Sequence, residues 1–315
     1  MALFHPLQIE RITKPTKDSA AITFCIPSSL KDDFSYTQGQ YVTLKSTIDG
    51  EEVRRSYSIC SSPLSNELTV AIKKLQGGKF STFANEKLKK GDLLDVMPPA
   101  GKFFVPLHNE HQKSYVAFAS GSGITPMLSI IETTLLVEEK SEFILFYGNR
   151  RAASIMFHEK LEALKNQFMG RFSIYHILSK ERQESDLFYG RIDAPKIDAF
   201  SSTFFDPETI DDYFICGPEE MMLAIQGQLI KQGVPKDKIH FELFSSGSKG
   251  SEDKKREATS SQSEITIIYD GNKMSFPYDS ELSILDVAYQ YGAALPYACK
   301  AGVCSTCVCK LEKGK

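Results

Sequence analysis

The most constraining feature of this chain is a run of cysteines close to residue 300. Four of its seven cysteines fall between Cys299 and Cys309. Cys299, Cys304 and Cys307 follow the spacing C-x4-C-x2-C, which loops a backbone around a [2Fe–2S] cluster and delivers three thiolates to the irons. A zinc site would favour paired C-x2-C units, often with histidines, and the sequence shows no such pairing. The spacing therefore predicts an iron–sulfur cluster, a centre that passes single electrons.

A cluster of this type needs a fourth cysteine, and Cys309 is the only one that follows Cys307 in the sequence. In an extended segment Cys309 would lie on the same side as Cys307, too close to reach the second iron. We therefore interpret Cys309 as a small strand residue and expect the fourth ligand beyond Lys315. A degenerate cluster domain is the alternative.

Composition limits the class of protein. With 315 residues the chain is long enough for two or three domains. Lys and Arg number 37 against 40 Asp and Glu, and no basic tract indicates a nucleic-acid surface. We find neither an apolar run as long as a membrane span nor a signal-peptide pattern. We expect a cytoplasmic protein, in which clustered cysteines bind metal rather than form disulfides.

Two large segments differ in the spacing of their apolar residues. Residues 1–110 alternate apolar and polar residues in short stretches such as 40–44 and 68–72, with turn signals at Asp49-Gly50 and Gly77-Gly78. This pattern predicts a small antiparallel β-barrel. Residues 111–244 place strand-like runs at 115–119, 143–147, 172–177 and 213–216 between helical patterns at 126–139, 155–168 and 218–232. Such alternation predicts an α/β domain with a parallel sheet.

The last part of the chain differs again. Residues 245–263 are rich in Ser, Gly and charge, with no apolar residue larger than alanine, which is typical of a flexible linker. A compact segment follows over residues 264–315, with strands expected at 265–269 and 274–276 and a helix at 283–291 before the cysteines. We predict a partial α+β domain of the ferredoxin-like, β-grasp kind.

The barrel segment contains two runs that suit a flat, phosphorylated cofactor. In the first, Arg55 could pair with phosphate oxygens, Tyr57 could lay its ring on an aromatic cofactor and Ser58 could bond a ring nitrogen. In the second, Gly78 and Ser81 open an expected helix, whose free N–H groups could hold a diphosphate. Alone, each run also fits an ordinary strand or a capped turn.

The α/β segment has two runs at strand ends. Gly121-Ser-Gly123-Ile-Thr125-Pro126 follows a strand and opens a helix, as a dinucleotide-binding turn does, with Pro126 in place of the third glycine. Cys216-Gly217-Pro218 ends another strand, and ligands of such folds lie at these ends. A structural turn and a buried strand cysteine are the plainer interpretations.

These four runs, in this order, resemble the ferredoxin–NADP reductase superfamily over roughly residues 6–244. Residues 264–315 look like a plant-type ferredoxin cut short. A reductase followed by a ferredoxin is similar to the reductase components of oxygenase and desaturase systems. The resemblance implies three cofactors: FAD, NADPH and a [2Fe–2S] cluster.

The resemblance also implies roles for individual residues. Ser58, Cys216 and Glu242 would lie along the path of the hydride. The FAD site would consist of Arg55, Tyr57, Ser58, Gly78, Ser81, Thr125 and Phe244, with Tyr57 and Phe244 on opposite faces of the flavin. The nucleotide site would consist of Gly121, Gly123, Thr125, Pro126, Arg150, Ser179, Arg182, Cys216, Gly217 and Pro218. Among these, Arg150, Ser179 and Arg182 could bind a 2′-phosphate, which favours NADPH over NADH.

The implied function is a reductase that takes electrons from NADPH and passes them through FAD and the cluster to a partner oxygenase. Flavin suits this position, because it accepts an electron pair and can release single electrons. A phenylacetyl-CoA epoxidase is the acceptor that the resemblance favours, and another oxygenase, hydroxylase or desaturase is the alternative. A non-catalytic flavin or iron–sulfur redox sensor is the alternative from a different class.

Overall fold

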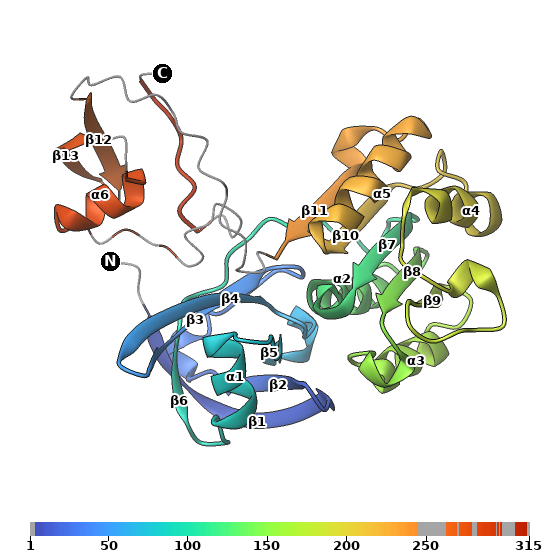
Figure 1. The fold of residues 1–315 in the computed structure, drawn as a ribbon, viewed down its shortest axis with the longest axis horizontal. Helices are drawn as coiled ribbons and strands as arrows, with labels where there is room; N and C mark the ends of the chain where they lie inside the picture. Colours follow the sequence, from blue (N-terminus) through green and yellow to red (C-terminus); the bar gives the residue numbers. More distant parts are fainter. Residues whose placement is uncertain are drawn as a thin grey trace.

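The computed structural model describes residues 4–244, 263–269, 271–278, 282–293, 295, 297 and 306–313. The chain forms three units, drawn from blue to red in Figure 1. No helix among the residues described is both long and apolar enough to cross a membrane.

The first unit is an antiparallel barrel. Its sheet has the strand order β4-β3-β6-β1-β2-β5. An antiparallel bridge between Ile59 and Val70 joins the end of β4 to β5 and closes the sheet. A short helix, α1, packs against the barrel (Figure 1). The elements are β1 (His5–Thr16), β2 (Ser19–Cys25), β3 (Tyr41–Ile48), β4 (Glu51–Ser58), β5 (Leu68–Lys73), α1 (Lys79–Glu86) and β6 (Leu93–Val96).

The second unit is a parallel sheet with helices on both faces, as the strand–helix alternation predicted. Its strand order is β11-β10-β7-β8-β9, and every pair is parallel. The elements are β7 (Ser114–Ser120), α2 (Ile124–Val137), β8 (Glu142–Asn149), α3 (His158–Gln167), β9 (Phe172–Leu178), α4 (Ala194–Phe204), β10 (Asp212–Gly217), α5 (Glu219–Lys231) and β11 (Ile239–Leu243).

Alternate strand residues of this sheet pack on opposite faces. Along β7, Tyr115 and Ala117 join the core under α2 and α3, whereas Val116 and Phe118 join the core under α4 and α5. A strand buried on both faces reads as a nearly continuous apolar run, which is why 115–119 was recognisable in the sequence.

The third unit contains β12 (Ser263–Tyr269), β13 (Asn272–Tyr278) and α6 (Ile284–Gln290). The two strands form an antiparallel hairpin, and a small core around Phe276 and Val287 joins them to α6. Ser283 caps α6, with its hydroxyl accepting from the Asp286 N–H at 3.1 Å. The expected linker 245–263 lies outside the described residues except for Ser263, which begins β12.

The structure corrects three details of the sequence-based prediction. The expected helix 155–168 begins at His158, because Phe157 has a φ of 59° and cannot continue the helix backward. Cys309, expected in a strand, is exposed in an irregular segment. Phe244 follows the last residue of β11 instead of ending that strand.

Candidate functional site at the junction of barrel and sheet

Three side chains predicted from separate motifs meet where the barrel faces the sheet. Ser58, the last residue of β4, donates a hydrogen bond from Oγ to Oε2 of Glu242 at 2.8 Å. Cys216 of β10 pairs in register with Glu242 of β11, so the two residues lie on neighbouring strands. Residues 184 positions apart in sequence are therefore in contact.

Burial changes the acid–base properties of this group. Desolvation raises the pKa of Glu242 from 4.5 to about 7, and the hydrogen bond from Ser58 opposes that rise in pKa. Desolvation also raises the pKa of the Cys216 thiol well above its ordinary value, with a smaller contribution from Glu242. Cys216 is fully buried and stays protonated at neutral pH. It therefore offers an uncharged sulfur at the strand end, without the reactivity of a thiolate.

The glycine turn after β7 lies against the same strand end. Gly121 has a φ of 54°, and the space where its Cβ would project is open. The Gly121 carbonyl accepts a hydrogen bond of 2.8 Å from the Tyr147 hydroxyl. A Cβ at Gly123 would lie 2.1 Å from the Cys216 carbonyl oxygen, so only glycine lets the turn approach β10 this closely. The open side of Gly121 fits a nucleotide phosphate beside the start of α2.

Other residues of the expected nucleotide site hold the local backbone. Thr125 is buried and donates to the Ser122 carbonyl at 3.0 Å. Pro126 is in the first turn of α2, where its missing N–H has no cost. A Cβ at Gly217 would lie 2.5 Å from Met221 Cε, and Pro218 is the residue before α5. These residues therefore shape the turns at the carboxyl ends of β7 and β10.

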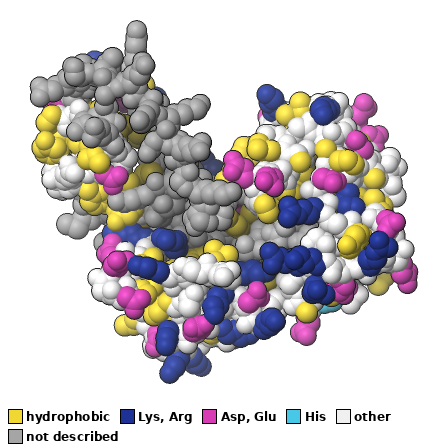
Figure 2. Space-filling model, in the orientation of Figure 1, with side chains coloured by type: hydrophobic (Ala, Val, Ile, Leu, Met, Phe, Trp, Pro, Cys, Tyr) yellow, Lys and Arg dark blue, Asp and Glu magenta, His cyan; other side chains and the backbone are white. Residues whose placement is uncertain are grey.

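The expected 2′-phosphate residues come together at the ends of β8 and β9. Backbone hydrogen bonds of 2.9 Å join Ser179 to Asn149 and Lys180 to Arg150. Arg182 is exposed and stacks on Tyr189, with its Cζ 5.4 Å from the ring centroid. Figure 2 shows Lys and Arg side chains spread across the front of the molecule, with Asp and Glu side chains among them. Arg150, Lys180 and Arg182 thus give these strand ends a local group of cations, beside the acidic Glu181 and Glu184.

The barrel side provides groups that fit FAD. Arg55 is exposed, and within the described part of the chain its guanidinium makes no ion pair, so it is available to a phosphate. Tyr57 is half-buried, and its ring centroid is 5.7 Å from that of Phe80. Burial raises the pKa of Tyr57, so its hydroxyl stays neutral. Among the described residues no side chain caps the start of α1 at Gly78, which leaves N–H groups for a diphosphate.

Two expected flavin residues have a more local setting. The Ser81 hydroxyl accepts from the Leu75 N–H at 3.1 Å and donates to the Gly78 carbonyl at 3.2 Å, so it holds the turn together. A Cβ at Gly78 would lie 2.4 Å from this hydroxyl. Phe244 packs against the core that lies between the barrel and α2. Its position is close to the junction on which the other residues converge.

Hydrogen bonds fix the barrel against the sheet. Ser129 and Thr133 of α2 donate to the Ser61 carbonyl at 2.6 Å and to the Ser62 hydroxyl at 2.9 Å. Phe103 packs edge-on against Phe214 of β10, with the centroids 5.7 Å apart. The barrel and the α/β unit are therefore joined by buried hydrogen bonds and by aromatic packing as well as by the Ser58–Glu242 pair.

Sequence reasoning missed a contact that brings the third unit to the same strands. Tyr41 pairs in register with Ser58, and directly opposed residues share one face of a sheet. The Tyr41 hydroxyl is 3.0 Å from the Thr306 hydroxyl, next to Cys307. Arg54 lies on the same face of β4 as Ser58 and stacks on Tyr297, with its Cζ 4.2 Å from the ring centroid. No motif signals these residues, because the contact exists only once the units pack together.

The expected cluster ligands are only partly described. Cys307 is half-buried, whereas Cys299 and Cys304 lie outside the described residues. The thiolate donor set and its spacing fit a [2Fe–2S] cluster. Cys307, the described member of the expected ligand set, is adjacent to Thr306, which contacts Tyr41 of β3.

Three family models match the chain in the order of its units. They are the oxidoreductase FAD-binding domain over residues 6–105, the oxidoreductase NAD-binding domain over residues 118–227, and the 2Fe-2S iron-sulfur cluster binding domain over residues 267–315. The three matches agree with the fold classes predicted from the sequence.

Two relatives match over nearly the whole of this chain. The chain is 42% identical to one of the subunits of the 1,2-phenylacetyl-CoA epoxidase of Escherichia coli (strain K12), over 100% of this chain and 88% of that protein. It is 28% identical to the 3-ketosteroid-9-alpha-monooxygenase ferredoxin reductase component of Rhodococcus rhodochrous, over 98% of this chain and 86% of that protein.

A solved structure has the same fold. The match to the structure of phthalate dioxygenase reductase covers 96% of this chain and 85% of that chain, with a TM-score of 0.64 and 21% sequence identity. The matched domains, their order and the full-length relative at 42% identity together show that this chain is a member of the ferredoxin–NADP reductase superfamily, an oxidoreductase with FAD-binding, NAD-binding and C-terminal 2Fe-2S domains.

Proposed function

We propose that this chain is the reductase of a phenylacetyl-CoA epoxidase system, taking electrons from NADPH and delivering them to the oxygenase. The observation that supports the electron path most directly is the shared face of β3 and β4. On that face Ser58 contacts Glu242 of the sheet, and Tyr41 contacts Thr306 beside Cys307. One pair of strands thus joins the hydride side to the cluster side.

Bound flavin would supply the conversion of a hydride's two electrons into single electrons. The chain's residues would hold and orient it. Arg55 would bind a phosphate, Tyr57 would stack on the ring and the start of α1 would bind the diphosphate. Phe244 would cover the opposite face of the ring and give way to nicotinamide.

Ser58, Cys216 and Glu242 would border the reacting atoms. Ser58 has a hydroxyl that can donate to a ring nitrogen. Glu242, with its pKa raised to about 7, can hold a proton at neutral pH. Cys216, uncharged and fully buried, would shape the place of the nicotinamide and exclude water.

We infer NADPH as the donor from the basic strand ends. Arg150, Ser179 and Arg182 lie on adjacent β8 and β9 ends, where a nucleotide's ribose would be reached from the glycine turn. Arginine is the residue suited to a 2′-phosphate. We also place the protein in the cytoplasm, where thiols stay reduced.

The nucleotide preference is tested by replacing Arg182 with alanine. Because a hydrogen bond to a charged group contributes about 1.5–3 kcal/mol, kcat/KM for NADPH should fall about ten- to a hundredfold in Arg182→Ala, with little change for NADH. Arg191→Ala is the control, since Arg191 is exposed and its partner Glu220 is 4.0 Å away. An equal loss with NADH and NADPH would contradict the proposal.

The acceptor is tested by coupling. In a mixture of the purified protein, NADPH and the epoxidase catalytic subunits, the amount of NADPH consumed should match the amount of phenylacetyl-CoA consumed. NADPH consumption that is uncoupled with this epoxidase but coupled with another oxygenase would favour the alternative acceptor. Failure of NADPH to reduce the flavin at all would favour a redox sensor, although the glycine turn at Gly121 argues for an enzyme.

A further inference from the structure

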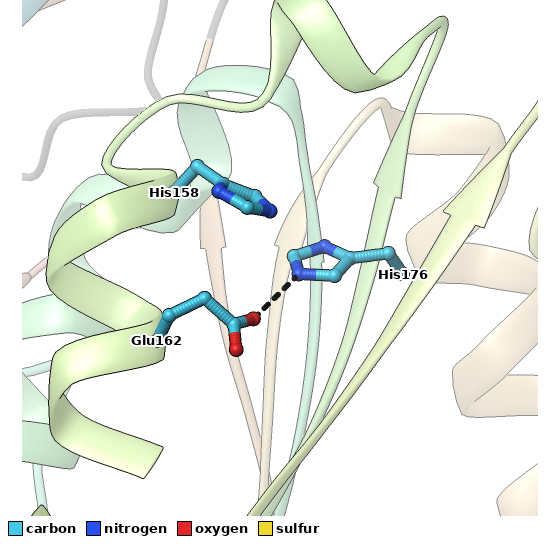
Figure 3. A group of neighbouring side chains, drawn as sticks. All are labelled: His158, Glu162 and His176. Carbon is cyan, nitrogen blue, oxygen red and sulfur yellow. Dashed lines mark ion pairs between the residues drawn. The ribbon is translucent and has the colours of Figure 1, made fainter. Parts of the chain in front are cut away.

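A compact group of metal-binding side chains lies apart from the junction described above. His158 and Glu162 are four residues apart on α3 and project from the same side of the helix toward His176 of β9 (Figure 3). One potential ligand atom from each residue lies within 4.8 Å of the others. None of the three residues has a part in the proposed electron path.

The ring nitrogens of His176 are the unusual feature of this group. Both are buried, and neither has a hydrogen-bond partner among the residues that the structure describes. Oε1 of Glu162 lies 3.6 Å from Nε2, within the range of an ion pair but longer than a hydrogen bond (Figure 3). Leaving such a group unsatisfied costs about 1–3 kcal/mol. A ligand between His176 and α3 would remove that cost.

The three side chains offer the donor atoms that metal ions bind. His158 and His176 each present imidazole nitrogens, and Glu162 adds a carboxylate oxygen. His158 is exposed and can turn toward the other two, which are half-buried.

We propose that His158, Glu162 and His176 form a zinc-binding site. Two imidazoles and one carboxylate are a ligand set that zinc accepts, with a fourth position left for water. Tetrahedral bonds of about 2.0–2.1 Å separate ligand atoms by roughly 3.3 Å, so rotation of the His158 and Glu162 side chains suffices to close the site.

A bound ion would join α3 to β9 close to the nucleotide turn. The His176 ring centroid is 6.0 Å from that of Tyr147, whose hydroxyl bonds the Gly121 carbonyl at 2.8 Å. Zinc bound by His176 would therefore restrain β9 where it packs beside Tyr147. We expect bound zinc to raise the midpoint of thermal unfolding, since it binds the folded state.

The test is a calorimetric titration of the full chain with ZnCl₂ after alkylation of its accessible thiols, which removes competition from the cysteines. His158→Ala and Glu162→Gln change side chains that are exposed or half-buried, so both variants should fold. Loss of a group that only orients a ligand costs about 10–100-fold in affinity, so loss of a ligand should weaken zinc binding at least tenfold. Glu159→Gln, an exposed neighbour on the same helix, is the matched control and should bind like the wild type.

A second measurement identifies the ligand atoms. The visible spectrum of the alkylated chain with Co²⁺ should show nitrogen and oxygen ligation without sulfur charge-transfer bands. Equal zinc affinity in all four proteins, or a cobalt spectrum dominated by sulfur, would overturn the proposal. Neither readout depends on flavin or nucleotide, so the outcome is independent of the proposed reductase activity.

Discussion

At the scale of single residues, the Ser58–Glu242 hydrogen bond is the clearest link between structure and chemistry. It joins two units through a carboxyl whose pKa is about 7. Such a group can change its protonation near neutral pH, as an acid–base group requires. A partly buried pair of this kind also has a measurable effect on stability.

The pKa of Glu242 predicts a pH-dependent stability of the flavin-free protein. Because the folded pKa of about 7 exceeds the ordinary 4.5, Glu242's contribution is fully present below pH 4.5 and is lost as pH rises through 7. The wild type should lose about 2 kcal/mol of unfolding free energy relative to Glu242→Gln between pH 5 and pH 8. Urea unfolding at the two values measures this, with Glu184→Gln as an exposed control. If the difference in unfolding free energy between the wild type and Glu242→Gln is the same at both pH values, the assigned pKa is wrong.

The sequence singled out Ser58 and Cys216 from two separate motifs and Glu242 from the family resemblance, and the structure brings the three residues together. It did not point to Tyr41 or Arg54. Both occupy strand positions that look ordinary, and their partners Thr306 and Tyr297 come from a unit more than 200 residues away. Contacts between units leave no local pattern in a sequence.

At the scale of elements, prediction succeeded where burial produces a pattern. The strands β7, β8 and β10 contain continuous apolar runs, β9 is an edge strand with Ser173 and His176 among its apolar residues, and each of the four was placed to within a residue or two. Helix α4 was missed, although Asp193 caps it through the Lys196 N–H at 3.2 Å and Pro195 occupies its first turn. Its start signals were present, but only two of its residues, Ile197 and Phe200, are buried, so its apolar pattern is weak.

The turn between β7 and α2 predicts a costly substitution. In Gly123→Ala the new methyl group would meet the Cys216 carbonyl at 2.1 Å, so the turn and β10 must separate. Overpacking of this kind costs about 1–3 kcal/mol. The midpoint of thermal unfolding should fall, whereas in the control Gly227→Ala, at an exposed helix position with nothing within 4 Å, it should rise slightly. An unchanged midpoint in Gly123→Ala would contradict the close approach.

The face of β3 and β4 predicts a role for Tyr41 in positioning the third unit. Tyr41→Phe removes a hydroxyl that bonds Thr306, at a net cost of about 1 kcal/mol, or roughly fivefold in the docked population. Amide hydrogen exchange over residues 306–313 should speed up by that factor. Tyr36→Phe is the control, because the Tyr36 hydroxyl bonds within the barrel, to Ser61 and Glu67. Unaltered exchange in Tyr41→Phe would show that this contact does not dock the unit.

At the scale of the whole molecule, the order of the units follows the order of electron transfer that we propose. The α/β unit would receive the nucleotide and the barrel would hold the flavin, while Thr306 and Tyr297 of the third unit contact Tyr41 of β3 and Arg54 of β4. The fold class of each unit was predictable, because barrel, parallel sheet and cysteine loop have distinct periodicities and compositions. Their mutual placement was not, because it depends on buried side chains such as Ser129 and Phe103 that no motif marks.

The account depends on a flavin held between barrel and sheet and reduced by nucleotide. The most direct measurement is an anaerobic titration of the FAD-reconstituted protein with NADPH, followed by visible absorbance. We predict one bound FAD per chain, bleached by one equivalent of NADPH, with slower bleaching in Ser58→Ala. A folded protein that binds no FAD, or whose bound FAD keeps its colour with both NADPH and NADH, would contradict the account.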